Sequence, residues 1–175
     1  KSINNKIPNS EITIIDTPGL IPDGRISDLI SVENGLKLVP AGEISRKTFK
    51  LEENQVFMFD VFCRFKILEN ELLKSGSKPI FSAYASKSVK FHVAREERVE
   101  ALLSGSFFEI LEGSEKEKYF QNEFVTHEVE IEENEELVIA GLGWINVKRG
   151  PLKIQLEVPE KVKVIIRPSI FRNKK

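Results

Sequence analysis

The tetrapeptide Asp16-Thr17-Pro18-Gly19 is the one stretch of this 175-residue chain whose residue types and spacing could take part in catalysis. It directly follows a segment, Glu11 to Ile15, that reads as an apolar strand, and it precedes a helix-like stretch. A bare D-x-x-G pattern often arises by chance, because Asp and Gly are common residues. The strand, loop and helix context raises its weight, and a loop of this kind could take part in phosphate and magnesium binding.

Other motifs that nucleotide chemistry would need are absent from the sequence. There is no G-x-x-x-x-G-K-[ST] phosphate loop and no Asn-Lys-x-Asp guanine-reading motif. Lys1-Ser2 could mimic the end of a phosphate loop, but it lacks the preceding glycines and lies too close to the strand at Glu11. No Ser-His-Asp or Cys-His set has a persuasive context either. We therefore expect this chain alone to bind nucleotide poorly or not at all and to be inactive as an enzyme.

The elements that would position this loop change character along the chain. Ser27 or Asp28 can cap a short helix after the loop, and Pro40 closes that segment. From Lys47 onward the apolar residues recur with a period of two, which predicts strands, and the alternation from Phe57 to Ile67 predicts one long strand. The apolar side of the helix would comprise Leu29, Ile30, Val32 and Leu36. Further strands are predicted at 79–85, 89–93, 125–131, 137–147, 152–158 and 162–167, with a helix at 95–103 and a polar loop at 112–122. We see no internal repeat.

Composition fits an ordinary globular domain with a sizeable core. Hydrophobic residues make up 41% of the chain and charged residues 30%, and twelve residues are Phe. The longest apolar runs, such as Leu137 to Ile145, are far shorter than the roughly 20 residues needed to span a bilayer, so no membrane segment is expected. A single cysteine, Cys63, cannot form an internal disulfide, and a reducing compartment, the cytoplasm, is the expectation.

Charge is distributed unevenly although the net charge is only −1. Residues 109–136 are strongly acidic, whereas residues 148–175 are strongly basic. A basic face is the electrostatic footprint of a protein that binds a phosphate backbone, although charge runs are more often solvated surface. The candidate RNA-binding residues are Lys148, Arg149, Lys161, Lys163 and Arg167.

Gly141, Gly143 and Trp144 form a motif inside a predicted strand. Without a third glycine and a helix it is not a dinucleotide fingerprint, and close backbone approach in a crowded sheet is the favoured role. Trp144 could alternatively stack a nucleobase. His127 falls on the apolar face of its strand and is expected to be mostly buried, whereas His92 is expected on the wetter face.

The order of these motifs resembles one protein family. The D-T-P-G loop looks like the third signature loop of P-loop GTPases, yet a β domain follows it in place of the guanine-reading motif, as in circularly permuted GTPases. The sequence resembles the YqeH family of these proteins over its full length. The segments that carry the resemblance are Ile14–Leu20, Leu36–Pro40, Thr126–Glu128 and Val138–Val147.

This resemblance implies that the chain is a C-terminal portion, with a zinc module and most of the G domain upstream. The fold class would be α+β. A truncated P-loop GTPase segment (strand, switch loop and helix) at residues 1–42 would be followed at residues 43–175 by a mainly antiparallel β domain with a helical insertion, similar to the RNA-binding attenuation protein fold. In the full-length protein Asp16 would hold magnesium through water, Gly19 would donate its N–H to the γ-phosphate, and Thr17 and Pro18 would shape the loop. GTP and Mg²⁺ would be cofactors of that protein only.

The implied function is GTP hydrolysis coupled to assembly of the small ribosomal subunit, with ribosomal RNA or a ribosomal protein as the partner of the β domain. Leu20 stands where many GTPases carry a water-orienting glutamine, so unaided hydrolysis would be slow. The alternative is a stand-alone β-domain adaptor that binds a protein or peptide without nucleotide chemistry.

Overall fold

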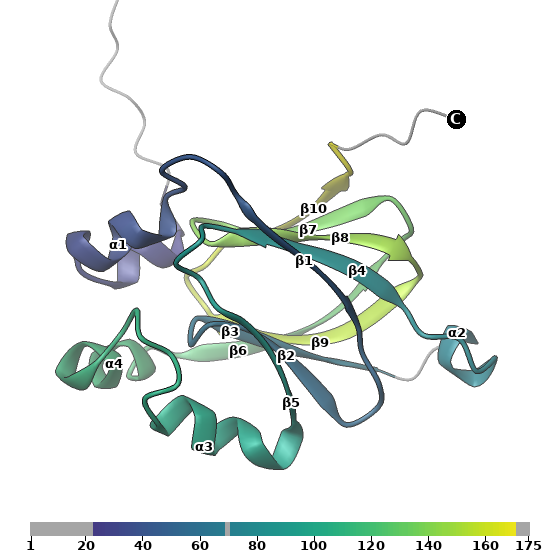
Figure 1. Cartoon of the computed structure of the whole chain (residues 1–175), viewed down its shortest axis with the longest axis horizontal. Helices are drawn as coiled ribbons and strands as arrows, with labels where there is room; N and C mark the ends of the chain where they lie inside the picture. The colour runs from purple at the N-terminus through teal and green to yellow at the C-terminus, as the bar shows by residue number, and fades with distance from the viewer. Residues whose placement is uncertain (1–22, 69–70, 171–175) are drawn as a thin grey trace, which may run out of the picture.

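Two five-stranded antiparallel sheets pack face to face in the computed structural model, which describes residues 23–68 and 71–170 (Figure 1). Sheet A has the strand order β1-β4-β8-β7-β10, and sheet B has the order β5-β2-β3-β9-β6. The strands of the first half are β1 (Ser45–Lys50), β2 (Gln55–Phe59), β3 (Cys63–Ile67), β4 (Ile80–Ala85) and β5 (Phe91–Arg95). Those of the second half are β6 (Phe124–Ile131), β7 (Glu135–Ile139), β8 (Gly143–Arg149), β9 (Leu152–Pro159) and β10 (Val164–Pro168).

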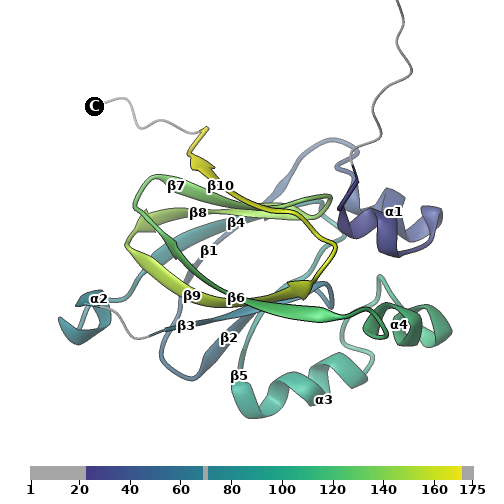
Figure 2. The same cartoon turned by 180° about the vertical axis from the view of Figure 1, so that it is seen from behind.

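Short helices lie around this sandwich rather than inside it (Figures 1 and 2). They are the 3₁₀ turns η1 (Ile26–Leu29) and η2 (Glu96–Arg98) and the helices α1 (Val32–Leu38), α2 (Glu71–Lys74), α3 (Val99–Ser104) and α4 (Gly113–Phe120). The segment from η2 to α4 forms the helical insertion between β5 and β6 and lies on the side of sheet B in both views. The expectation of a mainly antiparallel β domain with a helical insertion is confirmed.

Phenylalanine rings fill the space between the sheets. The ring centroid of Phe57 lies 5.0 Å from those of Phe59 and Phe65 and 5.2 Å from that of Phe81, and all four side chains are fully or almost fully buried. Each such ring contributes about 1.5–3 kcal/mol through burial, and Phe has no polar group left to satisfy. Cys63 is also buried, and burial raises the pKa of its thiol.

The two longest predicted strands are in fact hairpins. Phe59 pairs with Cys63 across a three-residue turn in which Asp60 has φ of 52°, and Ile139 pairs with Gly143 across a turn in which Gly141 has φ of 73°. The residues that flank each turn are four positions apart, and four is an even number. The alternation of buried and outward side chains therefore continues through the turn unbroken, so a period of two cannot reveal it.

Three further predictions were wrong in detail. Residues 112–122, expected as a polar loop, contain α4, whose one buried side chain is Tyr119, and the Tyr119 hydroxyl donates to the Phe62 carbonyl at 2.7 Å. One buried residue in eight gives no helical periodicity to detect. The cap of α1 is Ser31, whose hydroxyl accepts from the Asn34 N–H, and not Ser27 or Asp28. His127 is exposed because β6 is an edge strand.

The chain contains an internal structural repeat that the sequence alone did not reveal. Strands β1 to β5 and β6 to β10 have the same arrangement. If β1 is matched with β6, β2 with β7 and so on, the order of sheet A becomes β6-β9-β3-β2-β5, which is the order of sheet B in reverse. The turns agree as well: the Gln55 side chain accepts from the Glu52 N–H at 2.9 Å, and the Glu135 side chain accepts from the Glu132 N–H at 3.0 Å. The repeat could not be detected in the sequence because the two halves share strand register and turn geometry more than residue identity.

Residues 23–29 pack directly on one end of the sandwich. The Ile26 N–H donates to the Ala140 carbonyl at 2.9 Å, the Lys163 N–H donates to the Gly24 carbonyl at 2.8 Å, and Ile26 is fully buried. The segment that leads into α1 is therefore held by the turns that follow β7 and β9. The predicted strand at Glu11–Ile15 lies outside the described residues.

Candidate nucleic-acid interface

The outer face of sheet A presents side chains in rows that cross all five strands. The strand register places Tyr84 between Arg46 and Trp144, and continues the same row through Val138 to Ile165. Alternate residues such as Ala83 and Ile145 are buried and point into the core. Within the described ranges the helices lie beside this face or on the opposite sheet, and none lies across it (Figures 1 and 2).

The first row is a column of a cation and two aromatic rings. The rings of Tyr84 and Trp144 are stacked, with centroids 5.0 Å apart and planes inclined by 4°. The guanidinium carbon of Arg46 lies 5.8 Å from the Tyr84 ring centroid, within the range of a cation–π contact. Neighbouring strands are about 4.8 Å apart, so cross-strand neighbours with flat side chains stack naturally.

The next row along the strands is polar and centres on a buried carboxylate. Glu136 is fully buried on this face, where its oxygens accept from the Asn146 amide at 3.3 Å, the Arg167 Nε at 3.1 Å and the Ser169 hydroxyl at 3.1 Å. On β1 and β4, the hydroxyl oxygens of Thr48 and Ser82 lie 2.9 Å apart. The one carboxylate of these two rows is thus neutralised, and the free charge on the face is positive.

Lys148 adds a second cation to this face, on the far side of the polar row from Trp144. It lies on β8 two residues beyond Asn146, which places it on the same face as Trp144. Burial lowers the pKa of the Lys148 ammonium, and the positive charge of Arg46 lowers it further. The two cations are therefore close enough to repel each other, a cost that a bound anion would remove.

Two buried polar atoms of β8 have no hydrogen-bond partner among residues 23–68 and 71–170. They are Nε1 of the Trp144 indole and Oδ1 of the Asn146 amide, on the same strand and the same face. Buried polar groups are nearly always paired, so two unpaired atoms at neighbouring positions mark this part of the face as unusual.

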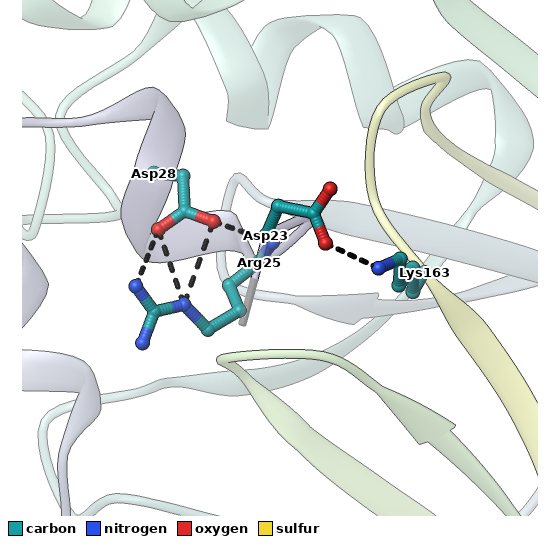
Figure 3. A network of polar contacts seen from close by, with 4 residues as sticks. All are labelled: Asp23, Arg25, Asp28 and Lys163. Atoms are coloured by element: carbon teal, nitrogen blue, oxygen red, sulfur yellow. Dashed lines mark hydrogen bonds and ion pairs between the residues drawn. The ribbon is translucent and has the colours of Figure 1, made fainter. Parts of the chain in front are cut away.

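The predicted basic residues do not form one patch. Lys161 and Lys163 lie in or beside the turn that joins β9 to β10, whereas Lys148 and Arg149 lie at the far end of β8. Lys163 pairs with Asp23, next to the separate pair of Arg25 with Asp28 (Figure 3). The Lys163–Asp23 pair joins the segment before η1 to the sandwich, whereas the Arg25–Asp28 pair is local to that segment and η1.

Arg167 pairs with the buried Glu136 and so has a structural contact of its own. Of the five basic residues, Lys148 shares the outer face with Trp144 without an ion pair of its own among the described residues, and Arg149 and Lys161 are exposed. Sequence reasoning missed Arg46 and Tyr84 altogether. Their positions on strands gave no signal, because only the pairing register brings them next to Trp144.

Gly141 and Gly143 both lie where another part of the chain comes close. A Cβ on Gly143 would fall 2.2 Å from the Tyr84 carbonyl oxygen, and a Cβ on Gly141 would fall 2.6 Å from the Cβ of Arg25. Gly143 therefore allows β8 to lie tightly against β4 directly beside the stacked rings. The loop Asp16, Thr17, Pro18 and Gly19 lies outside the described residues.

The opposite side of the sandwich carries a groove of a different chemistry. A cavity of about 470 Å³ lies between α3, α4 and sheet B, and its apolar lining comes from Leu103, Phe120 and Phe124. At one wall Arg64 pairs with Glu157 through Nε at 2.9 Å and Nη2 at 2.7 Å. In the internal repeat, this ion pair occupies the place that the stacked Trp144 and Tyr84 occupy in sheet A.

Two other kinds of site are absent within residues 23–68 and 71–170. No three His, Cys, Asp or Glu side chains there are grouped as a metal site would require. None of the helices described there has the length and apolar character needed to cross a bilayer.

Comparison with known proteins identifies the family. The family model described as YqeH-like, C-terminal, matches residues 78–170, which is more than half of the chain and includes every strand from β4 to β10. The uncharacterized protein YqeH of Bacillus subtilis (strain 168) is 26% identical over 161 residues, which cover 91% of this chain and 42% of that protein. The chain thus spans less than half the length of this curated relative. By the family match, the chain belongs to the YqeH-like family and contains its C-terminal domain.

Proposed function

We propose that the β sandwich binds RNA through the outer face of sheet A, within a longer protein that binds and hydrolyses GTP. The observation that carries the RNA proposal is the group Arg46, Tyr84, Trp144 and Lys148, which we call the aromatic–basic face. Membership of the YqeH-like family supports an association with a GTPase. Assistance to small ribosomal subunit assembly, with ribosomal RNA as the partner, is the process that this combination favours.

The chemistry of this face suits a single-stranded nucleic acid. Aromatic side chains bind unpaired bases by stacking, and neighbouring cations bind the phosphates that join those bases. Arg46 and Lys148 supply positive charge on this face, and the one carboxylate of the two rows, Glu136, is already held by Arg167. This face therefore attracts a polyanion, and neither of the two rows has an exposed carboxylate that would repel it.

Reversing both cations of the aromatic–basic face will test RNA binding. We expect the double variant Arg46→Glu, Lys148→Glu to bind a fluorescein-labelled 12-nucleotide RNA at least tenfold more weakly, and the slope of log Kd against log salt to fall by about two. Fluorescence anisotropy over a salt series measures both quantities. The matched control is Arg98→Glu, Lys118→Glu, which makes the same charge change on η2 and α4 at exposed positions on the side of sheet B. Equal losses in the two variants would contradict the assignment to sheet A.

The nucleotide part of the proposal concerns the longer protein. There the loop at Asp16–Gly19 would contact GTP and Mg²⁺, together with a phosphate loop and a guanine-reading motif that this chain does not contain. Helix α1 supports a contact with such a neighbouring domain, because Val32 and Leu36 on its surface are 80% and 66% exposed. On its other side α1 is tied to α4, since the Glu115 carboxylate accepts from the Ser31 N–H and the Asn34 amide, both at 2.7 Å.

Titration with a fluorescent GTP analogue and Mg²⁺ tests this part. We expect no saturable binding by this chain and micromolar or tighter binding by the longer protein that includes the upstream half. The matched control is the longer protein with Asp16→Ala, in which Mg²⁺-dependent binding should weaken. Micromolar binding by this chain alone would reveal a phosphate site of another kind and overturn the proposal.

The groove beside sheet B favours a second candidate function, an adaptor that binds a peptide. Its apolar lining from Leu103, Phe120 and Phe124 would hold an apolar side chain of a partner. Salt separates the two functions, because RNA binding weakens steeply with ionic strength whereas binding in an apolar groove does not.

A further inference from the structure

We infer that Trp144 stacks one unpaired base of a bound RNA, on the indole face turned away from Tyr84 and above Val138. This inference rests on the proposed function, since it names the place on sheet A where a base would be held. It concerns single-stranded RNA, because a base paired within a duplex is already stacked on its neighbours and is not free to enter the column.

The column of flat side chains on sheet A ends at Trp144 on β8. Arg46, Tyr84 and Trp144 lie on β1, β4 and β8, and each contacts the ring next to it. The following position, on β7, carries Val138, which is directly paired with Trp144 but has only a short branched side chain. A planar base above Val138 would extend the column by one further strand spacing of about 4.8 Å.

The far side of that position is closed by an exposed apolar residue. Ile165 on β10 is paired with Val138 and is 52% exposed. Within the part of the chain that the structure describes, Tyr84 is the one ring stacked on Trp144, so the second face of the Trp144 indole has no aromatic partner there. A base at this position would lie between the indole and Ile165 and would cover apolar surface on both sides.

Polar atoms next to this position are also unpaired. The Trp144 Nε1 donor and the Asn146 Oδ1 acceptor lack partners, and a nucleotide carries both acceptors and donors that could serve them after a small side-chain shift. The Arg46 cation lies at the other end of the column and Lys148 lies beyond the polar row, so both would face phosphates of neighbouring nucleotides. A free stacking surface and unpaired polar atoms thus coincide at one place on the sheet.

Trp144 is the only tryptophan of the chain, so intrinsic fluorescence reports on this position directly. We expect oligoadenylate of 12 nucleotides to quench the emission at saturation, whereas heparin, a polyanion without bases, should bind without comparable quenching. The same oligoadenylate annealed to oligouridylate should quench less. Quenching of equal size by heparin would show that the cations alone are engaged, and would overturn the inference.

Variants separate stacking from folding. Trp144→Leu should weaken oligoadenylate binding by about tenfold while heparin binding is unchanged, and Trp144→Phe should recover part of the loss. Val138→Phe would place a ring of the protein itself in the base position and should weaken oligoadenylate binding similarly, with Val138→Ala as its matched control. Circular dichroism confirms that each variant is folded.

The outcomes also distinguish this inference from the proposed function. Oligoadenylate binding that depends on Arg46 and Lys148 but is unaffected by Trp144→Leu and Val138→Phe would overturn the stacking position and leave RNA binding by sheet A intact. If the unaltered protein binds neither oligoadenylate nor any other single-stranded RNA of that length, both proposals fail.

Discussion

Replacing Gly143 with alanine will lower the free energy of unfolding by about 3 kcal/mol, because the new methyl group has no room between β8 and β4. Its Cβ would lie 2.2 Å from the Tyr84 carbonyl oxygen and 3.1 Å from the Cβ of Ala85. Both neighbours belong to the paired strand, so neither can rotate away as a flexible side chain would. The two strands would have to separate at the register pair of Ala85 with Gly143.

Urea denaturation followed by circular dichroism measures this loss. Gly76→Ala is the matched control, since Gly76 has φ of 77° but nothing lies within 4 Å of the place that a methyl group would take there, and we expect a loss of only about 1 kcal/mol. Gly35→Ala, in α1 with ordinary contact distances, should be neutral or slightly stabilising. A loss at Gly143 no larger than that at Gly76 would show that sheet A tolerates wider strand separation than its register implies.

The sequence was sufficient to predict the class of fold because alternation is a local property. Strands near 80–85, 124–131, 152–159 and 164–168 were each predicted within about two residues of their bounds, since one face of each is opposed by the core. The hairpin turns after Phe59 and Ile139 were missed for a reason that is equally local. A three-residue turn between residues on the same face leaves the alternation in phase, so the turn has no signature in hydrophobicity.

The candidate site depends on pairing register, which a single sequence does not contain. Trp144 could be identified as a possible stacking residue from its type alone, but its partner Tyr84 lies sixty positions earlier and Arg46 earlier still. The five basic residues predicted from the charged tail are separated by the same strand geometry. Two of them, Lys163 and Arg167, pair with carboxylates, so their sequence proximity to other cations says little about a common surface.

The residues at equivalent positions of the internal repeat explain why sheet A and not sheet B presents such a face. In sheet B the equivalent cross-strand position holds the Arg64 and Glu157 ion pair, and helix α3 brings a further carboxylate, Glu100, to 3.6 Å from Arg64. Charges there are balanced locally. In sheet A the same positions hold Trp144 and Tyr84, and Arg46 and Lys148 on that face have no ion-pair partner among the described residues. Two copies of one arrangement thus present chemically different faces.

Replacing Glu136 with alanine will destabilise the protein by about 3 kcal/mol, because its carboxylate is the common acceptor of several groups on sheet A. The Ile170 N–H donates to it at 3.2 Å in addition to Arg167, Asn146 and Ser169. Glu136→Gln retains an acceptor oxygen and should lose less, about 1 kcal/mol. The exposed pair of Glu43 with Lys87 is the control, and Glu43→Gln should change stability by less than about 0.5 kcal/mol. Equal losses for Glu136→Ala and Glu43→Gln would contradict this role.

Because Glu136 is held by Arg167, charge-reversal variants of the basic residues 148–175 differ in what they report about RNA binding. Arg167→Glu would set a second carboxylate against the fully buried Glu136, so a loss of RNA binding in that variant would follow from damage to sheet A. Lys161→Glu alters an exposed residue in the turn before β10 and leaves the polar row intact. We expect Lys161→Glu to bind RNA normally, and Arg167→Glu both to unfold at lower urea concentration and to lose binding. That result would mean that Arg167 affects RNA binding through its ion pair with Glu136, and that the aromatic–basic face makes the contact with RNA.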